Sequence, residues 1–209
     1  MNQVSGGRSY DRFISFSDAV VAVAATVLIL PIVDIAAPKA GQNVGSILLT
    51  NFNGIYSYFI TFIVIVIFWR VHHKILDGTS AYDGRLLILN TAWLATIAFL
   101  PWPTAMLGQE GGFGRGVGTF YFGVLALSTF ILLLMQLHIR RTPELWEDPN
   151  TAPVSRLSRS VIYIAIWTFL AVLSVFMSEG MALVSWALFI LGAVTLVAFL
   201  IISRRKRAA

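Results

Sequence analysis

Residues 12–35 read RFISFSDAVVAVAATVLILPIVDI, and between Asp18 and Asp34 this stretch carries no charge. A helix needs about 20 mostly apolar residues, at ~1.5 Å per residue, to cross the ~30 Å hydrocarbon layer of a membrane. The stretch meets that requirement, and most of its polar residues gather near its start. It therefore predicts a transmembrane helix over residues 12–35.

Five further stretches of the chain have the same length and apolar character. They cover residues 44–75, 85–107, 117–140, 157–177 and 181–203. Strands are disfavoured because a lone strand leaves its backbone groups unpaired in lipid, and the ten-residue alternation of a membrane barrel is absent. The sequence predicts an all-α polytopic membrane protein, with six transmembrane helices that form a single unit over residues 1–209.

The composition agrees with this interpretation. Hydrophobic residues make up 57% of the chain and charged residues 12%, whereas roughly 25% of the residues in a soluble domain are charged. A surface so poor in charge faces lipid, so the bilayer is the first predicted partner. The chain has no cysteine, which excludes disulfide bonds and thiolate metal sites.

The basic residues are distributed unevenly across the predicted helices. Of the 15 Lys and Arg residues, all but Lys39 and Arg115 fall on one side of a six-helix topology. Because basic residues favour cytosolic loops, both termini are predicted to lie in the cytosol. The basic tail at residues 204–209 is interpreted as a stop signal beside anionic lipid, and no nucleic-acid partner is expected.

Asp18 is the charge whose position inside a predicted span is most informative. It lies about 9 Å deeper along the helix than Arg12. One interpretation is a helix N-cap together with Ser17, worth about 1 kcal/mol. The other is a buried anchor that pairs with a polar group on a neighbouring helix, for which His72 and Asn90 lie at a compatible depth.

Two histidines, His72 and His73, close the second predicted span. Adjacent residues on a helix project about 100° apart, so these two are not expected to share a metal ion. An interfacial pair without a ligand and a role in proton transfer both stay open. A membrane enzyme is disfavoured, because these histidines with Asp77 and Asp83 match no catalytic motif.

One face of the first predicted helix forms an apolar stripe interrupted by a single hydroxyl. At helical spacing this stripe consists of Phe16, Ala19, Val20, Val23, Thr26, Val27 and Leu30. Periodicity alone favours a helix packed in the bundle core. The alternative is a pore lined by a narrow hydrophobic constriction, which is a known gating device.

Three segments within the first three predicted spans have the pattern of a known family. The first is Arg12 to Asp18 (RFISFSD), followed by the Ala24 to Pro31 segment (AATVLILP). The second is FWRVHH at residues 68–73, and the third runs from Leu89-Asn90 to the FLP segment at residues 99–101. These segments resemble the transmembrane protein 175 family of endosomal and lysosomal potassium channels. The resemblance covers the first three spans well, and the last three only by hydropathy.

This resemblance implies a specific architecture and function. Bacterial members of the family are tetramers of a six-helix chain, and their first helices line a central pore for potassium. The implied constriction falls on Val23, with Thr26, Val27 and Leu30 further along, although the family more often has Ile or Leu at the Val23 position. The residues that resemble the family's helix-anchoring network are Arg12, Phe16, Ser17, Asp18, Trp69, His72, Asn90 and Trp93.

The sequence thus predicts a homotetrameric potassium channel in the plasma membrane of a prokaryote. We expect no cofactor, no resident metal and no soluble substrate, only permeant K⁺, with Rb⁺ and Cs⁺ also passing. A secondary or proton-coupled transporter is the alternative function. It is disfavoured because the second to sixth spans offer almost no ionisable group near the middle of the membrane.

Overall fold

The computed structural model describes residues 4–33, 43–109, 116–148 and 157–175, and these residues are mostly helical. The helices and strands, in chain order, are β1 (Ser5–Gly6), α1 (Arg8–Val27), α2 (Leu30–Val33), α3 (Val44–Thr50), α4 (Phe52–Leu76), β2 (Ala81–Tyr82), α5 (Gly84–Phe99), α6 (Pro101–Leu107), α7 (Val117–Arg141), the 3₁₀ helix η1 (Pro143–Leu145) and α8 (Leu157–Val175).

Four helical segments in the described residues are long and apolar enough to cross a membrane. They are Arg8–Val33, Phe52–Leu76, Gly84–Leu107 and Val117–Arg141. The prediction of a helical, multi-pass membrane protein is therefore confirmed. Helix α8 lies where the fifth span was predicted. The sixth predicted span at 181–203 and the basic tail at 204–209 lie outside the described residues.

Two of the spans are broken beside a proline. A proline has no backbone N–H, so the carbonyl four residues earlier loses its helical partner. In the first span, α1 ends at Val27 and α2 begins at Leu30, one residue before Pro31. In the third span, α5 ends at Phe99 and α6 begins at Pro101. Both breaks interrupt a span without ending it.

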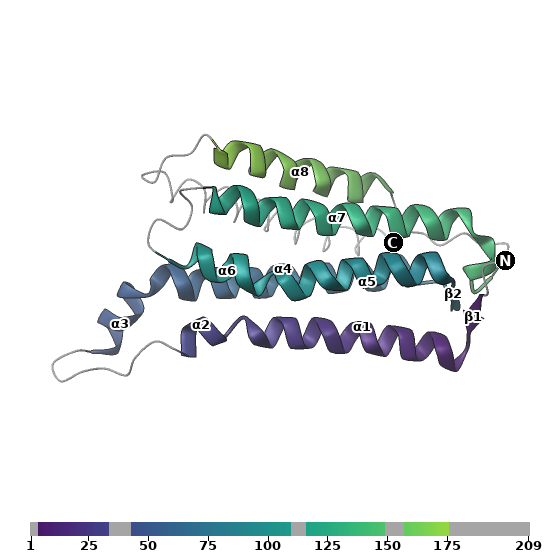
Figure 1. Ribbon diagram of the computed structural model, residues 1–209, viewed down its shortest axis with the longest axis horizontal. Helices are drawn as coiled ribbons and strands as arrows, with labels where there is room; N and C mark the ends of the chain where they lie inside the picture. Colours follow the sequence, from purple (N-terminus) through teal and green to yellow (C-terminus); the bar gives the residue numbers. More distant parts are fainter. Residues whose placement is uncertain (1–3, 34–42, 110–115, 149–156, 176–209) are drawn as a thin grey trace, which may run out of the picture.

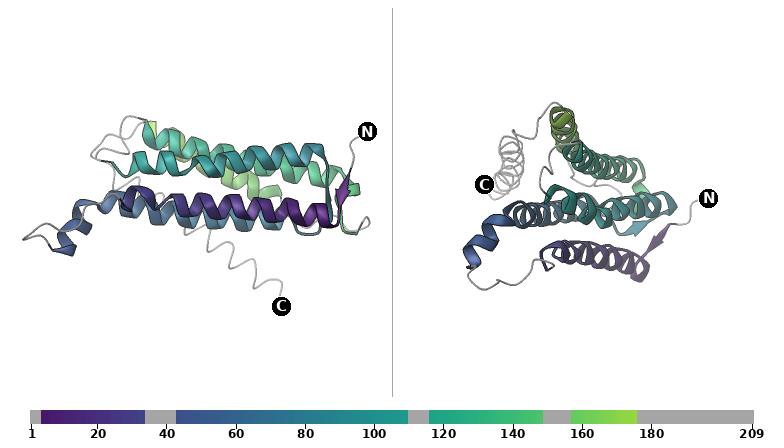
Figure 2. Two further views of the ribbon diagram at one scale, coloured as in Figure 1. Left: turned by 60° about the horizontal axis from the view of Figure 1, so that its bottom comes forward. Right: turned by 60° about the vertical axis from the view of Figure 1, so that its left-hand side comes forward.

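The helices pack as successive layers, with α1 at one edge of the described bundle (Figures 1 and 2). Helix α1 packs against α4 and α5, and α7 packs against α5 on one side and α8 on the other. The described core is mostly apolar, with some buried polar side chains such as His72 and Asn90. Its largest fully buried side chains include Trp93, Leu86 and Ile97 on α5 and Leu125 and Met135 on α7.

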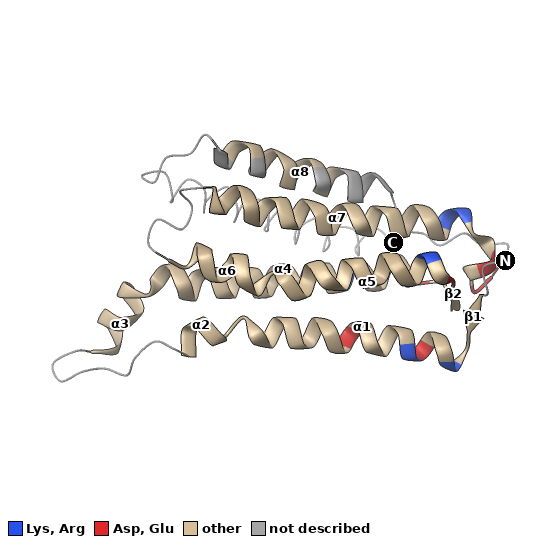
Figure 3. Cartoon of the chain, in the orientation of Figure 1, with Lys and Arg blue, Asp and Glu red and all other residues tan. Residues whose placement is uncertain are grey.

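Charged residues gather at the end of the bundle where β1 and β2 lie (Figure 3). The two short strands pair antiparallel there, with Ser5 opposite Tyr82 and Gly6 opposite Ala81. Gly7 follows β1 with a φ of 59°, which only glycine adopts readily, and it turns the chain into α1. We refer to this end as the ribbon end of the bundle.

Candidate functional site

One face of helix α1 is buried and the opposite face is exposed. Its buried residues, Phe13, Ser17, Val21 and Ala24, recur every three or four positions and face the rest of the chain. The predicted stripe lies on the other face, and apart from the half-buried Val20 all of its members are exposed. The described chain therefore covers one side of α1 and leaves the other side apolar and uncovered.

A chain of buried hydrogen bonds joins three helices through Ser17, Asn90 and His72. The His72 Nε2 atom lies 2.7 Å from Asn90 Oδ1, and Asn90 Nδ2 donates to Ser17 Oγ at 2.8 Å. Ser17 Oγ in turn donates to the backbone carbonyl of Phe13 at 2.9 Å. An amide oxygen can only accept, so Nε2 of His72 carries the proton in this arrangement. The order of donors and acceptors is therefore consistent from His72 Nε2 through Asn90 and Ser17 to the Phe13 carbonyl.

The stacking of His72 on Trp93 holds the imidazole in place. The two rings lie parallel within 5°, with centroids 4.2 Å apart. Both residues are fully buried, at 0% exposure. Within the described residues, His72 Nδ1 and Trp93 Nε1 have no hydrogen-bond partner. Since an unsatisfied buried polar atom costs about 1–3 kcal/mol, the stack and the Asn90 bond must offset this cost.

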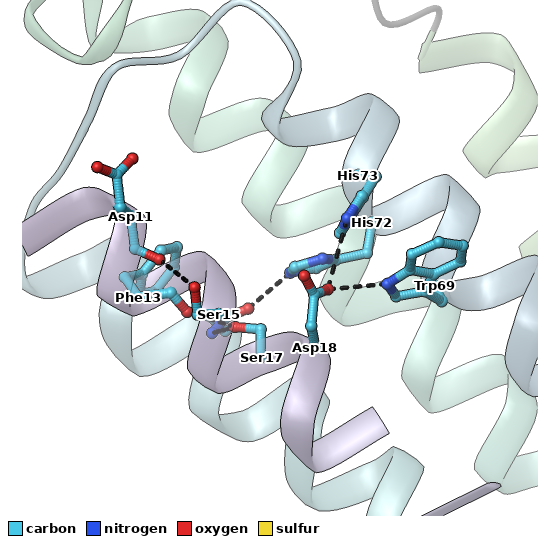
Figure 4. A network of polar contacts seen from close by, with 9 residues as sticks. Asp11, Phe13, Ser15, Ser17, Asp18, Trp69, His72 and His73 are labelled. Atoms are coloured by element: carbon cyan, nitrogen blue, oxygen red, sulfur yellow. Dashed lines mark hydrogen bonds and ion pairs between the residues drawn. The ribbon is translucent and has the colours of Figure 1, made fainter. Parts of the chain in front are cut away.

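Asp18 contacts the same stretch of α4 from the neighbouring face of α1 (Figure 4). Its Oδ1 atom accepts from Trp69 Nε1 at 2.8 Å and lies 3.4 Å from His73 Nε2. The Asp18 side chain is 40% exposed and that of His73 37%. This pair is thus open to screening, in contrast to the buried chain through Asn90.

The structure differs from the sequence analysis on the surroundings of Asp18. Asp18 is not an N-cap, because α1 begins ten residues earlier at Arg8 with Gly7 before it. His72 and Asn90, expected as its partners, bond to each other instead, and Asn90 donates to Ser17. Ser17 and Asp18 lie at a similar depth but project about 100° apart around α1. The depth of Asp18 in the span was therefore not enough to predict its partners.

Two other members of the predicted network lie outside these hydrogen bonds. Arg12 is exposed, and Phe16 is 62% exposed on the uncovered face of α1. Among the described contacts, neither residue has a hydrogen bond to the Ser17, Asp18, Asn90 or His72 side chains. The side chains that the structure brings together are Ser17, Asp18, Trp69, His72, His73, Asn90 and Trp93.

The residues of the predicted constriction lie along the uncovered face. Val23 is 60% exposed, Val27 37% and Leu30 57%. Thr26 is exposed as well, and its hydroxyl donates to the Val23 carbonyl at 2.8 Å. This leaves the lone pairs of the Thr26 hydroxyl oxygen directed away from that bond, on an otherwise apolar surface.

A second polar cluster, which the sequence analysis did not anticipate, joins α5 to α7 at the ribbon end. Asp83 precedes α5 and accepts from the Leu86 amide at 2.8 Å, which caps the helix. Its two carboxylate oxygens also lie 2.9 and 3.0 Å from Nε2 of His138 on α7. Burial alone would raise the pKa of Asp83, but the Leu86 amide and the His138 ring lower it below its ordinary value.

The same cluster holds the start of α1. The Tyr10 hydroxyl lies 2.5 Å from Thr79 Oγ1 and donates to the Leu76 carbonyl at 3.3 Å. Phe13 stacks on Tyr82, with ring centroids 4.8 Å apart. Together with the pairing of β1 and β2, these contacts fix the first turns of α1 to the segment that precedes α5.

The segment after α7 completes the connection. Thr79 pairs with Trp146 in an isolated β-bridge, and the Ser80 amide donates to the Leu145 carbonyl at 3.0 Å. Trp146 Nε1 also donates to the Ile139 carbonyl at 2.7 Å. We call residues 5–10, 76–83 and 138–147 together the ribbon clamp. It links α1, α4, α5 and α7 by direct hydrogen bonds.

The described residues contain no cluster of three or more His, Asp or Glu side chains that could hold a metal ion. Within these residues, hydrogen bonds between helices join Ser17, Asn90 and His72 and, separately, Asp83 and His138, so these side chains hold the helices in position.

Comparisons with known proteins identify the family of the chain. The family model described as the endosomal/lysosomal potassium channel TMEM175 matches residues 12–101. A protein from Streptomyces collinus named as a potassium channel is 33% identical over 153 residues, which cover 71% of this chain and 73% of the relative. The chain belongs to the TMEM175 family. That family is an ion-channel family rather than an enzyme class.

Other TMEM175 relatives match shorter segments. A potassium channel from Chamaesiphon minutus is 32% identical over 100 residues, 47% of this chain and 49% of that protein. The human endosomal/lysosomal proton channel TMEM175 is 28% identical over 124 residues. The match covers 59% of this chain but only 25% of the human protein.

Solved structures show the same fold. A TMEM175 homologue from Chamaesiphon minutus, described as a lysosomal potassium-selective channel homologue, superposes with a TM-score of 0.71 at 21% identity. The superposition covers 92% of this chain and 98% of that one. A variant of the potassium channel MtTMEM175 gives a TM-score of 0.60 at 16% identity and covers 93% of both chains. The chain thus has the TMEM175 fold.

Proposed function

We propose that this protein is the subunit of a potassium channel in the plasma membrane of a prokaryote. Four six-helix chains would surround a central axis, with both termini in the cytosol. The membership of the TMEM175 family and the potassium channels among its relatives support this function. The ribbon end, where the charged residues gather, would lie on the cytosolic side.

One observation carries the assignment of the pore to the first helix. Helix α1 lies at the edge of the described bundle, and within the described residues one of its faces is buried and the opposite face is apolar and exposed. Lipid can cover such a face, but it would do so without using the Thr26 hydroxyl. Four copies that share an axis would instead turn Val23, Val27 and Leu30 into apolar rings, with a ring of hydroxyls at Thr26 between them.

These rings suggest a mechanism for gating. When the rings are narrow, water leaves them, and an ion would lose its hydration with nothing to replace it. A small outward shift of the first helices would widen the rings and admit partly hydrated cations. Selection for potassium over sodium would then depend on the easier dehydration of K⁺ and on the Thr26 hydroxyls. Rb⁺ and Cs⁺ are expected to pass as well, without any cofactor.

The test is a flux assay with pure protein in liposomes. A passive potassium flux that exceeds the sodium flux under an equal gradient is the expected result. Saturable exchange that requires a second ion gradient, without passive current, would show that the protein is a transporter and not a channel. The mass of the protein in detergent should correspond to four subunits.

A further inference from the structure

We propose that the Asp83–His138 pair is a pH-sensitive clasp that restrains the start of the pore helix. This inference rests on the proposed function, because it concerns the outward shift of α1 that would open the channel. It adds a control by protons at the ribbon end, away from the residues that would line the pore.

The first step is the geometry of the pair. His138 is 14% exposed and Asp83 3%, so water screens their interaction weakly. A carboxylate can only accept hydrogen bonds, so the His138 Nε2 atom donates to it in both protonation states of the ring. The bond therefore persists when the ring is neutral. It becomes stronger when the ring is protonated, because a charged donor then faces a charged acceptor.

The second step is the connection to α1. Asp83 follows β2 directly, and β2 pairs with β1, the strand from which α1 starts. Thr79, on the same segment, contacts Tyr10 on α1 and Trp146 after α7. Any force that holds Asp83 to α7 thus also holds the first turns of α1 to the body of the chain.

The third step compares the residue types around the pair by the pH range in which each type changes charge. The segments around the pair carry other charged or titratable groups, namely Arg8, Tyr10, Asp11 and Arg12 on α1, Lys74 on α4, Asp77 after it, Tyr82 on β2, Arg85 on α5, Arg140 and Arg141 on α7, Glu144 on η1, and Glu147 and Asp148 after it. None of these types normally changes charge between about pH 5 and 8, whereas histidine does. The other two histidines of the chain, His72 and His73, lie on α4 in the network with α1.

The sign of the effect follows. Protonation of His138 strengthens the bond to the Asp83 carboxylate, so the clasp is tighter at pH 6 than at pH 8. A tight clasp opposes the outward shift of α1. Potassium flux through the wild-type protein should therefore increase by about threefold between pH 6 and pH 8, as a charged hydrogen bond gives way to a neutral one.

The experiment measures potassium flux in liposomes with the same pH on both sides, at pH 6 and at pH 8. His138→Gln keeps an N–H donor for Asp83 but does not titrate, and Asp83→Asn keeps a helix cap but removes the charge. Both variants should conduct with a pH 8 to pH 6 ratio near one. Glu144→Gln, at an exposed position of η1, serves as the matched control and should keep the wild-type ratio.

A wild-type ratio in either assembled variant would overturn the inference. If both variants fail to assemble, thermal unfolding of the wild-type protein decides instead. Its Tm must then be higher at pH 6 than at pH 8, and a Tm that is equal or lower at pH 6 contradicts the clasp. Absence of potassium flux from the wild-type protein would refute the proposed function, while the unfolding measurement would still test the clasp.

Discussion

Asn90 on α5 donates to Ser17 on α1 across 2.8 Å, in a part of the bundle where both side chains are buried. The same amide group accepts from His72 on α4 through its oxygen. One side chain therefore ties the proposed pore helix to its two neighbours in the chain. Both bonds lie in the membrane-spanning part of the bundle, where water cannot replace a lost partner.

Asn90→Leu should destabilise the protein by about 2–4 kcal/mol, because it leaves the His72 ring and the Ser17 hydroxyl buried with fewer partners. Thermal unfolding in detergent measures the effect as a lower Tm. Thr91→Ala is the matched control on the same helix, because Thr91 is exposed and bonds only to the Leu87 carbonyl one turn earlier. Equal Tm values for the two variants would contradict the structural role of Asn90.

Trp69→Phe should have a smaller effect. The change removes the Nε1 donor to Asp18 and keeps an aromatic ring beside His73, whose centroid lies 4.7 Å away. Because this bond is partly exposed, we expect a loss of about 0.5–1.5 kcal/mol in unfolding free energy. A loss as large as that of Asn90→Leu would show that Asp18 is more buried in the assembled protein than in the single chain.

Asp18→Ala should chiefly reduce the fraction of protein that assembles into the proposed tetramer. Without the carboxylate, Trp69 and His73 lose their shared partner, and the orientation of α1 against α4 becomes less defined. Size-exclusion chromatography with mass determination gives this fraction, and flux measurements give the conduction of what remains. An intact tetramer with normal conduction would remove Asp18 from the helix-anchoring network.

Acid should destabilise the ribbon clamp through Asp83. Its pKa lies below the ordinary value, so its carboxylate contributes stability above the unfolded pKa, and that contribution is lost as the pH falls through the folded pKa. The loss is therefore expected below about pH 4. Asp83→Asn should flatten this part of a plot of Tm against pH. A wild-type slope in that variant would assign the acid sensitivity to other carboxylates.

Much of this structure could be predicted from the sequence, because the bilayer imposes a simple requirement on length and polarity. The predicted first and fourth spans overlap Arg8–Val33 and Val117–Arg141 closely. The second span shows what hydropathy does not resolve. It begins as predicted at Val44, but a separate helix, α3, precedes Asn51, and the long helix α4 starts only at Phe52.

The polar contacts were harder to predict, for two different reasons. The charge of Asp18 inside a span predicted a buried contact at that residue, but its uncharged neighbour Ser17 accepts the buried hydrogen bond from Asn90. The partner of Asp83 lies 55 residues away in His138, and no local pattern connects them. The two strands of the ribbon have two residues each, which is too short for an alternating pattern to appear.

Val23→Asp should raise potassium flux if the stripe lines the pore. A carboxylate at Val23 would keep water in the constriction and attract cations to it, so flux should rise several-fold. Flux in liposomes provides the measurement, after the tetramer has been verified. A folded tetramer with unchanged flux would contradict the assignment of Val23 to the constriction.

The most direct test of the pore assignment uses the absence of cysteine from the chain, because Val23→Cys then carries one thiol per subunit. A charged, water-soluble thiol reagent should reach this cysteine through the pore and block potassium flux. Ile88→Cys, at a site on α5 that is 69% exposed, is the control and should keep its flux. Block in Val23→Cys alone is the predicted result. Two results would contradict a pore lined by α1. In the first, the reagent does not modify the cysteine of Val23→Cys and the potassium flux stays full. In the second, the reagent modifies this cysteine and the potassium flux still stays full.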